Sequence, residues 1–214
     1  RAGFRQTAVA IAETYRPPYL GLGVEVNRYY EFDPAGFDSY LTAYAETYDA
    51  IKAVSPGTLV FPILQLEMTK GGGYLMGHSE AREPQWELLD RFGDRLDLAA
   101  FTTYPFLDYA SPADLPEDYY AEIAAHTSRQ VAFTEIGWPS APFANAPDSE
   151  YGGSEVEQAA FVERFFELTA STKLDLALWS FPHDLGLSPA SNPAMASISL
   201  RHNDGRPKPA LAAW

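Results

Sequence analysis

The chain has 214 residues, of which 46% are hydrophobic, so it can bury a sizeable core and is expected to form one domain. Its 29 acidic and 15 basic residues give a net charge of -14, which argues against nucleic acid or a membrane surface as a partner, because both attract a basic face. The sequence holds no cysteine, so disulfides, thiolate nucleophiles and cysteine-bound metals are excluded.

Helix and strand patterns alternate along the chain. Helix patterns occur at residues 1–15 and 36–53, after Pro84, after Pro116, and after the capping box of Ser154 and Glu157. Short apolar runs typical of buried strands occur at residues 19–25, 58–64, 97–103, 130–134 and 174–179. No apolar run approaches the roughly 20 residues that a membrane-spanning helix needs.

Such alternation predicts a parallel sheet with right-handed crossovers. Two architectures satisfy it. One is an open, doubly wound sheet, and the other is the later part of an eight-stranded (β/α)8 TIM barrel. A complete barrel typically needs about 250 residues, so the length by itself favours the open sheet.

Two glutamates follow strand patterns in the same way. Glu135 comes directly after the apolar run 130–134, and Glu25 ends the run 19–25. In a barrel, two intervening strands would place both glutamates on one rim, whereas an open sheet would hold them apart. Two carboxylates about 5 to 5.5 Å apart can cleave a glycosidic bond with retention of configuration. The barrel and this chemistry are therefore predicted together.

Four segments resemble strands 4, 6, 7 and 8 of the clan A glycoside hydrolases: YLGLGVEVNRYY, LAAFTTYPF, VAFTEIGWPS and LALWSFPHD. They are most similar to the endo-β-1,4-galactanase family and its bacterial relatives, and TEIGWPS also resembles plant-type endo-β-1,3-glucanases. The resemblance implies a (β/α)8 TIM barrel of which the chain supplies roughly the C-terminal five β/α units. Residues 1–214 would then form a single catalytic barrel domain that is incomplete at its N-terminal side.

The resemblance also implies roles for single residues. Glu25 matches the general acid/base, and Glu135 matches the nucleophile. Tyr104 matches a partner close to the nucleophile, and Trp179 matches a platform under the sugar. These enzymes carry Asn directly before the acid/base, where it bonds the sugar 2-hydroxyl, but this chain has Val24 there.

Other candidate residues follow from position. Asn27, two residues after Glu25, is expected to reach the sugar in place of the absent asparagine. Trp138 is either a wall of the substrate site or a packing residue. His183, directly after the last strand pattern, is expected to contact substrate. Gln65 and Glu67, at the end of the run 58–64, are expected to be exposed to solvent, with substrate contact as the alternative.

The four histidines show no metal-ligand spacing, so neither a metal nor another cofactor is expected. The sequence thus predicts a retaining glycoside hydrolase that acts on a β-linked polysaccharide or oligosaccharide outside the cytoplasm, in the extracellular space or the periplasm. One alternative is a carbohydrate-binding or scaffold protein that kept the barrel and lost catalysis, and another is an open-sheet nucleotide module. Because strands 1 to 3 of the barrel have no counterpart, we expect a missing segment or another chain to complete it.

Overall fold

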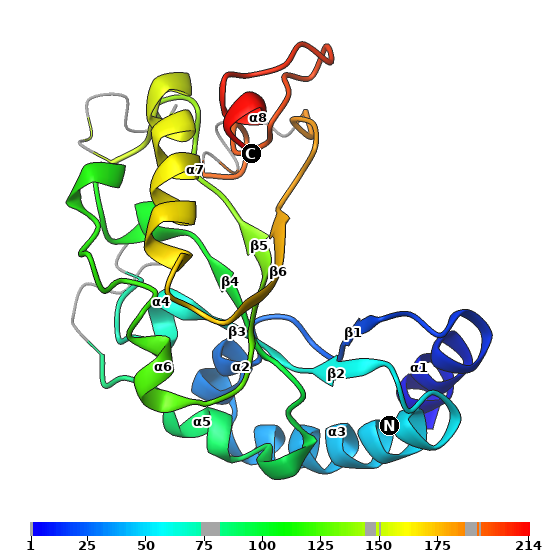
Figure 1. Ribbon diagram of the computed structural model, residues 1–214. Helices are drawn as coiled ribbons and strands as arrows, with labels where there is room; N and C mark the ends of the chain where they lie inside the picture. The colour runs from blue at the N-terminus through cyan, green and yellow to red at the C-terminus, as the bar shows by residue number, and fades with distance from the viewer. Residues whose placement is uncertain (1, 74–81, 144–148, 150, 187–191, 193) are drawn as a thin grey trace.

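The computed structural model describes residues 2–73, 82–143, 149, 151–186, 192 and 194–214 (Figure 1). Its strands are β1 (Tyr19–Gly21), β2 (Leu59–Phe61), β3 (Ile63–Gln65), β4 (Ala99–Thr103), β5 (Val131–Ile136) and β6 (Leu174–Trp179). β1 pairs with β2, and the other four form a second sheet in the order β3-β4-β5-β6. All of these pairs are parallel, as the alternating pattern predicts.

The helices that connect the strands differ greatly in length. The long ones are α1 (Ala2–Tyr15), α3 (Pro34–Val54) and α7 (Glu155–Thr169). The short ones are α2 (Val26–Phe32), α4 (Leu66–Thr69), α5 (Glu87–Asp90), α6 (Ile123–His126), α8 (Ala210–Ala213) and the 3-10 turns η2 (Gly93–Arg95), η3 (Pro105–Leu107) and η4 (Pro112–Asp114). None of the helices described here is long and apolar enough to cross a membrane.

The two faces of the strands are covered differently, and this decides between the two predicted architectures. The main core lies between the strands and the helices. The opposite face carries a small cluster made by Phe61, Ile63, Leu98, Ala100 and Ala132, whose partly buried neighbours also lie in strands. A doubly wound sheet would have helices on both faces, so the open-sheet alternative is wrong. The strands form part of a barrel wall (Figure 1). The small cluster lies on the face away from the helices, which is the inner face of that wall.

Local chemistry explains where the predicted elements hold and where they fail. Ser154 caps α7, since its Oγ accepts from the backbone N–H of Glu157 at 3.2 Å, and β6 has the predicted bounds. The predicted strand 58–64 is divided at Pro62, which has no N–H to donate, and its two parts belong to different sheets. The helix predicted directly after Pro116 is wrong, because that segment forms turns and only α6 is helical.

The inner face stays open on one side. Among the described residues, β1 pairs only with β2, and β6 pairs only with β5. Leu178, in β6, is 46% exposed as a result. Apolar side chains of α1, among them Phe4 and Ile11, are also exposed. These edges are where further β/α units would continue a barrel.

Candidate active site

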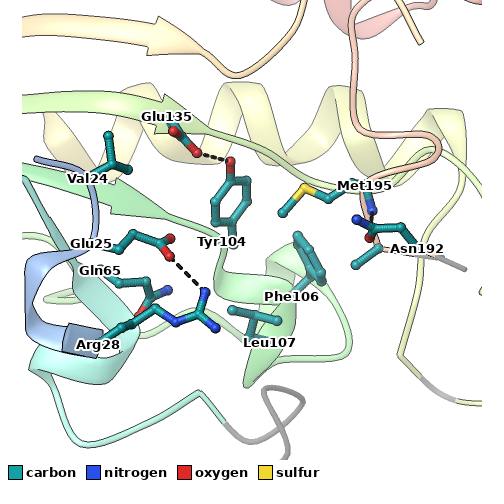
Figure 2. A pocket seen from close by; sticks show the side chains of 11 residues that line it. Val24, Glu25, Arg28, Gln65, Tyr104, Phe106, Leu107, Glu135, Asn192 and Met195 are labelled. Atoms are coloured by element: carbon teal, nitrogen blue, oxygen red, sulfur yellow. Dashed lines mark hydrogen bonds and ion pairs between the residues drawn. The ribbon is translucent and has the colours of Figure 1, made fainter. Parts of the chain in front are cut away.

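A cavity of about 380 Å³ lies where β3, β4 and β5 end and the chain leaves β1 (Figure 2). The carboxyl ends of the strands are the usual place for catalytic groups in such barrels. The described residues that line the cavity are Val24, Glu25, Arg28, Gln65, Tyr104, Phe106, Leu107, Glu135, Asn192, Ala194 and Met195. Both predicted catalytic glutamates therefore face the same space.

Glu135 is aimed by an irregularity in β5. Phe133 pairs with Phe101 and Glu135 pairs with Thr102, so Thr134 is an extra residue without a partner in β4. A bulge of this kind re-aims the side chain that follows it, and here that side chain is the predicted nucleophile. Glu135 is the penultimate residue of β5, so it lies within the strand and not just beyond its end.

Tyr104 holds one oxygen of this carboxylate. Its phenol donates to Glu135 Oε2 at 2.6 Å (Figure 2), and Ser180 Oγ lies 2.8 Å from the same phenol oxygen. Burial raises the pKa of Tyr104 well above its usual range, and the hydrogen bond to Glu135 raises it further. The phenol therefore stays a donor, and Glu135 keeps its second oxygen for the cavity.

Glu25 is held in a different way. Its backbone is left-handed, with φ 50° and ψ 46°, which costs a residue other than glycine on the order of 1 kcal/mol or more. Its Oε1 accepts from Thr102 Oγ1 at 3.0 Å, and its Oε2 pairs with Arg28 at 2.9 Å. The side chain thus points back toward β4 although its own strand has already ended.

Thr102 connects the two glutamates. It donates to Glu25 and is the register partner of Glu135 on the neighbouring strand. Adjacent strands lie about 4.8 Å apart, so the two carboxylates occupy neighbouring places on one wall. Figure 2 shows both pointing into the space beside Tyr104. This juxtaposition is the one on which a two-carboxylate mechanism depends.

Four of the predicted substrate contacts lie elsewhere, and the first two are Asn27 and Trp138. Asn27 is fully buried, and its amide bonds both backbone groups of Gln65 and the hydroxyl of Thr69, so it ties α2 to β3 instead of facing the cavity. Trp138 is fully buried against Phe106 and Phe161, which is the packing alternative.

Trp179 and His183 are also away from the cavity. The indole of Trp179 donates to the Ile198 carbonyl at 2.7 Å, and its ring packs against Phe161 and Trp214 on the helix side of β6. It therefore does not form a platform among the described lining residues. His183 is exposed and lies beyond the described lining of the cavity.

Sequence reasoning missed several residues around the cavity. The expected exposure of Gln65 and Glu67 is wrong, since both are fully buried and Gln65 lines the cavity. Ser180 and Arg28 were not recognised either. A usable signal existed for Ser180, because it stands at the carboxyl end of a predicted strand, as Glu135 does. The same kind of position gave Gln65 its alternative of substrate contact, which agrees with its place on the cavity. Arg28 depends on the first turn of α2, which the sequence pattern did not reveal.

Within the described part of the chain, no group of three or more histidine, aspartate and glutamate side chains could hold a metal ion. Val24, which stands where the resembled enzymes have Asn, lies on the cavity and is 58% exposed. Arg28 is the only basic residue among the described lining residues, and its side chain is 43% exposed.

No family model and no curated protein matches the sequence. Several solved structures are similar to the chain. A GH113 β-1,4-mannanase has 17% identity and a TM-score of 0.57, and the match covers 98% of this chain and 58% of the mannanase. The GH53 catalytic domain of Ignisphaera aggregans has 14% identity and a TM-score of 0.65, with 99% and 63% covered.

An active-site mutant of the Rhizomucor miehei β-1,3-glucanosyltransferase, in complex with laminaritriose, is also similar. It has 16% identity and a TM-score of 0.53, and the match covers 79% of this chain and 56% of the transferase. These likenesses show the fold, which is a (β/α)8 TIM barrel in part. The chain spans 58% and 63% of the first two structures, consistent with its two unpaired strand edges.

Proposed function

We propose that this chain is part of a retaining glycoside hydrolase that cleaves a β-linked polysaccharide or oligosaccharide. The observation that carries the proposal is that Glu25 and Glu135 face one cavity, where Glu25 accepts a hydrogen bond from Thr102, the register partner of Glu135. The similar structures include a β-1,4-mannanase and a β-1,3-glucanosyltransferase, and these β linkages support the same class of substrate here.

The proposed reaction is a double displacement in two steps. Glu135 attacks the anomeric carbon with the oxygen that Tyr104 leaves free, while Glu25 donates its proton to the departing oxygen. A covalent glycosyl-enzyme forms and the leaving sugar departs. Glu25, now ionised, takes a proton from water, which attacks the anomeric carbon and releases Glu135. No metal or other cofactor is needed for either step.

For the substrate we propose a β-1,4-galactan first, because the sequence resembles the endo-β-1,4-galactanase family most. A polymer of this kind is met outside the cytoplasm, so the proposed location is the extracellular space or the periplasm. We also propose that further β/α units, in the same polypeptide or another, pair with the free edges of β1 and β6. Exposed Leu178 and the apolar face of α1 support this completion.

The first test measures hydrolysis of β-1,4-galactan and of a panel of aryl β-glycosides by the protein with its completing β/α units and by its Glu135→Gln variant. The variant keeps the shape of the side chain but has no nucleophile, so turnover should fall by about 10⁴-fold or more. Glu117→Gln, on an 86% exposed side chain that is not among the described lining residues, is the matched control. Proton NMR of the first product should show the configuration of the substrate.

The proposal is wrong if the barrel completed by those further β/α units hydrolyses no β-glycoside, or if its Glu135→Gln variant retains the rate of the unaltered protein. A first product of inverted configuration would keep the hydrolase and exclude the double displacement. Each of these results is distinct, because the first two concern turnover and the third concerns its stereochemistry.

One observation favours a second function, that of a carbohydrate-binding or scaffold protein. Val24 offers no hydrogen bond at the position where the resembled enzymes hold the sugar 2-hydroxyl. Titration calorimetry that shows binding of a β-linked oligosaccharide without any turnover would support this alternative over hydrolysis.

A further inference from the structure

A third glutamate lies directly behind the floor of the cavity. Glu67 is in the first turn of α4, fully buried, and takes no part in the proposed displacement. Its neighbours are the two cavity residues Gln65 and Tyr104, together with Thr103 and Tyr119. A buried carboxylate is costly unless donors surround it, so this arrangement calls for a role.

The four donors divide between the two oxygens. Oε2 accepts from Gln65 Nε2 and from the backbone N–H of Tyr104, the latter at 3.1 Å. Oε1 accepts from Thr103 Oγ1 at 2.8 Å and from Tyr119 Oη at 2.9 Å. Both partners of Oε2 are N–H groups, which can only donate. The two hydroxyls at Oε1 can rotate and accept a hydrogen bond instead.

Both partners of Oε2 connect to the catalytic pair. Tyr104 carries the phenol that holds Glu135, and Gln65 lies beside Glu25 and Arg28 on the cavity wall (Figure 2). The buried carboxylate of Glu67 is therefore hydrogen-bonded to one cavity residue on the Glu25 side, Gln65, and to one on the Glu135 side, Tyr104.

The surroundings of Glu67 are mostly neutral. Tyr119 contacts it directly, and Tyr120 reaches it through Thr103, while Lys70 lies over the Tyr119 ring and pairs with Glu122. Burial raises the pKa of Glu67 to about 7, against the opposing effect of its hydrogen bonds with Tyr104, Thr103 and Tyr119. The group thus gains and loses its proton near neutrality.

We infer that Glu67 is a positioning residue that fixes Gln65 and Tyr104, and through Tyr104 the carboxylate of Glu135. The inference deepens the proposed function and rests on it, but the placement of Tyr104 can be measured without turnover. The physical reason is that the N–H of Tyr104 and the amide of Gln65 have one shared acceptor in a buried place.

Two variants separate the effect of the volume of the Glu67 side chain from the effect of its hydrogen-bond acceptors. In Glu67→Gln, the amide oxygen can accept from Gln65 and Tyr104, and the amide nitrogen can donate to the hydroxyls of Thr103 and Tyr119. In Glu67→Leu, both obligatory donors lose their acceptor at nearly unchanged volume. Glu122→Gln is the matched control, since Glu122 pairs with Lys70 close by and does not line the cavity.

The experiment records the ¹³Cζ signal of Tyr104 in tyrosine-labelled protein, assigned with Tyr104→Phe. We expect this signal to titrate near pH 7 in the unaltered chain and in Glu122→Gln, and to lose that inflection in Glu67→Gln. In Glu67→Leu the signal should shift at every pH. Where the chain hydrolyses a β-glycoside, kcat should fall on the order of 100-fold in Glu67→Leu, with KM changed far less.

The inference is overturned if the Tyr104 signal keeps its inflection in Glu67→Gln, a result that stands even where Glu67→Leu does not fold. It is also overturned if Glu67→Leu folds with an unchanged Tyr104 signal. A completed barrel without turnover whose Tyr104 signal responds as expected would instead refute the proposed function alone.

Discussion

The two proposed catalytic glutamates are held by different kinds of structure. Glu135 belongs to β5, a strand of six residues that is paired on both sides, with β4 and with β6. Glu25 follows β1, a strand of three residues that pairs only with β2 among the described residues. One carboxylate therefore depends on backbone ladders, and the other depends on a few side-chain bonds.

The side-chain bonds on the Glu25 side come from three places. Thr102 and Arg28 each hold one oxygen of the carboxylate, and Asn27 clamps the start of α2 to Gln65. Backbone ladders survive the loss of any one side chain, whereas a clamp fails when its one residue is replaced. The Glu25 side should therefore be the more fragile of the two.

Among the changes that test this difference between the two sides, Glu25→Gln is expected to have the largest effect on turnover. Removing a general acid/base should lower turnover of a substrate with a poor leaving group by roughly 10²–10⁴-fold. The loss should be small for an aryl glycoside with a good leaving group, and azide should restore part of it, because azide attacks the glycosyl-enzyme without a base. Kinetics across a series of leaving groups measure this.

Glu46→Gln, on an exposed side chain of α3, serves as the control for that series. Equal losses for good and poor leaving groups, with no response to azide, would remove the acid/base role from Glu25.

The next effect concerns stability. Asn27→Ala leaves the buried N–H of Gln65 without its acceptor, which should lower the free energy of unfolding by about 2 kcal/mol. Urea denaturation measures the loss, with the exposed Asn203→Ala as control. Amide exchange should accelerate in α2 and stay unchanged in β5. Equal acceleration in both elements would show that the two sides are held as one unit.

The smallest effect is expected from Val24→Asn. An amide at this exposed cavity position can bond the sugar 2-hydroxyl as in the resembled enzymes, so kcat/KM should rise by roughly three- to tenfold. Stability should change by less than about 0.5 kcal/mol, since the residue is exposed. Val156→Asn, at an exposed position of α7, is the control. An unchanged or lower kcat/KM would mean that another group already contacts this hydroxyl.

Much of the fold was predictable because the signals are local. The apolar runs predict the parallel strands, and β6 agrees with its run residue by residue. Ser154 marks the start of α7 for the same reason, since a cap acts within one turn. The break at Pro62 could also have been read locally, because proline lacks the N–H that a central strand uses.

The candidate site was predictable only in part. Glu25, Glu135 and Tyr104 each follow or end a strand, and the structure brings these three together. Asn27, Trp138 and Trp179 have the right residue types close to the same strands, yet they face the core. Sequence position along a strand end does not show which way a side chain turns.

The sequence by itself determined that parallel strands carry carboxylates at their ends, since periodicity and residue type are properties of short segments. Only the tertiary structure decided which faces those residues take. The bulge at Thr134, the hydrogen bond of Glu25 with Thr102 and the buried contacts of Glu67 all involve residues far apart in the chain. Such contacts form between distant segments, and their spacing in the sequence does not predict how the side chains are oriented in the fold.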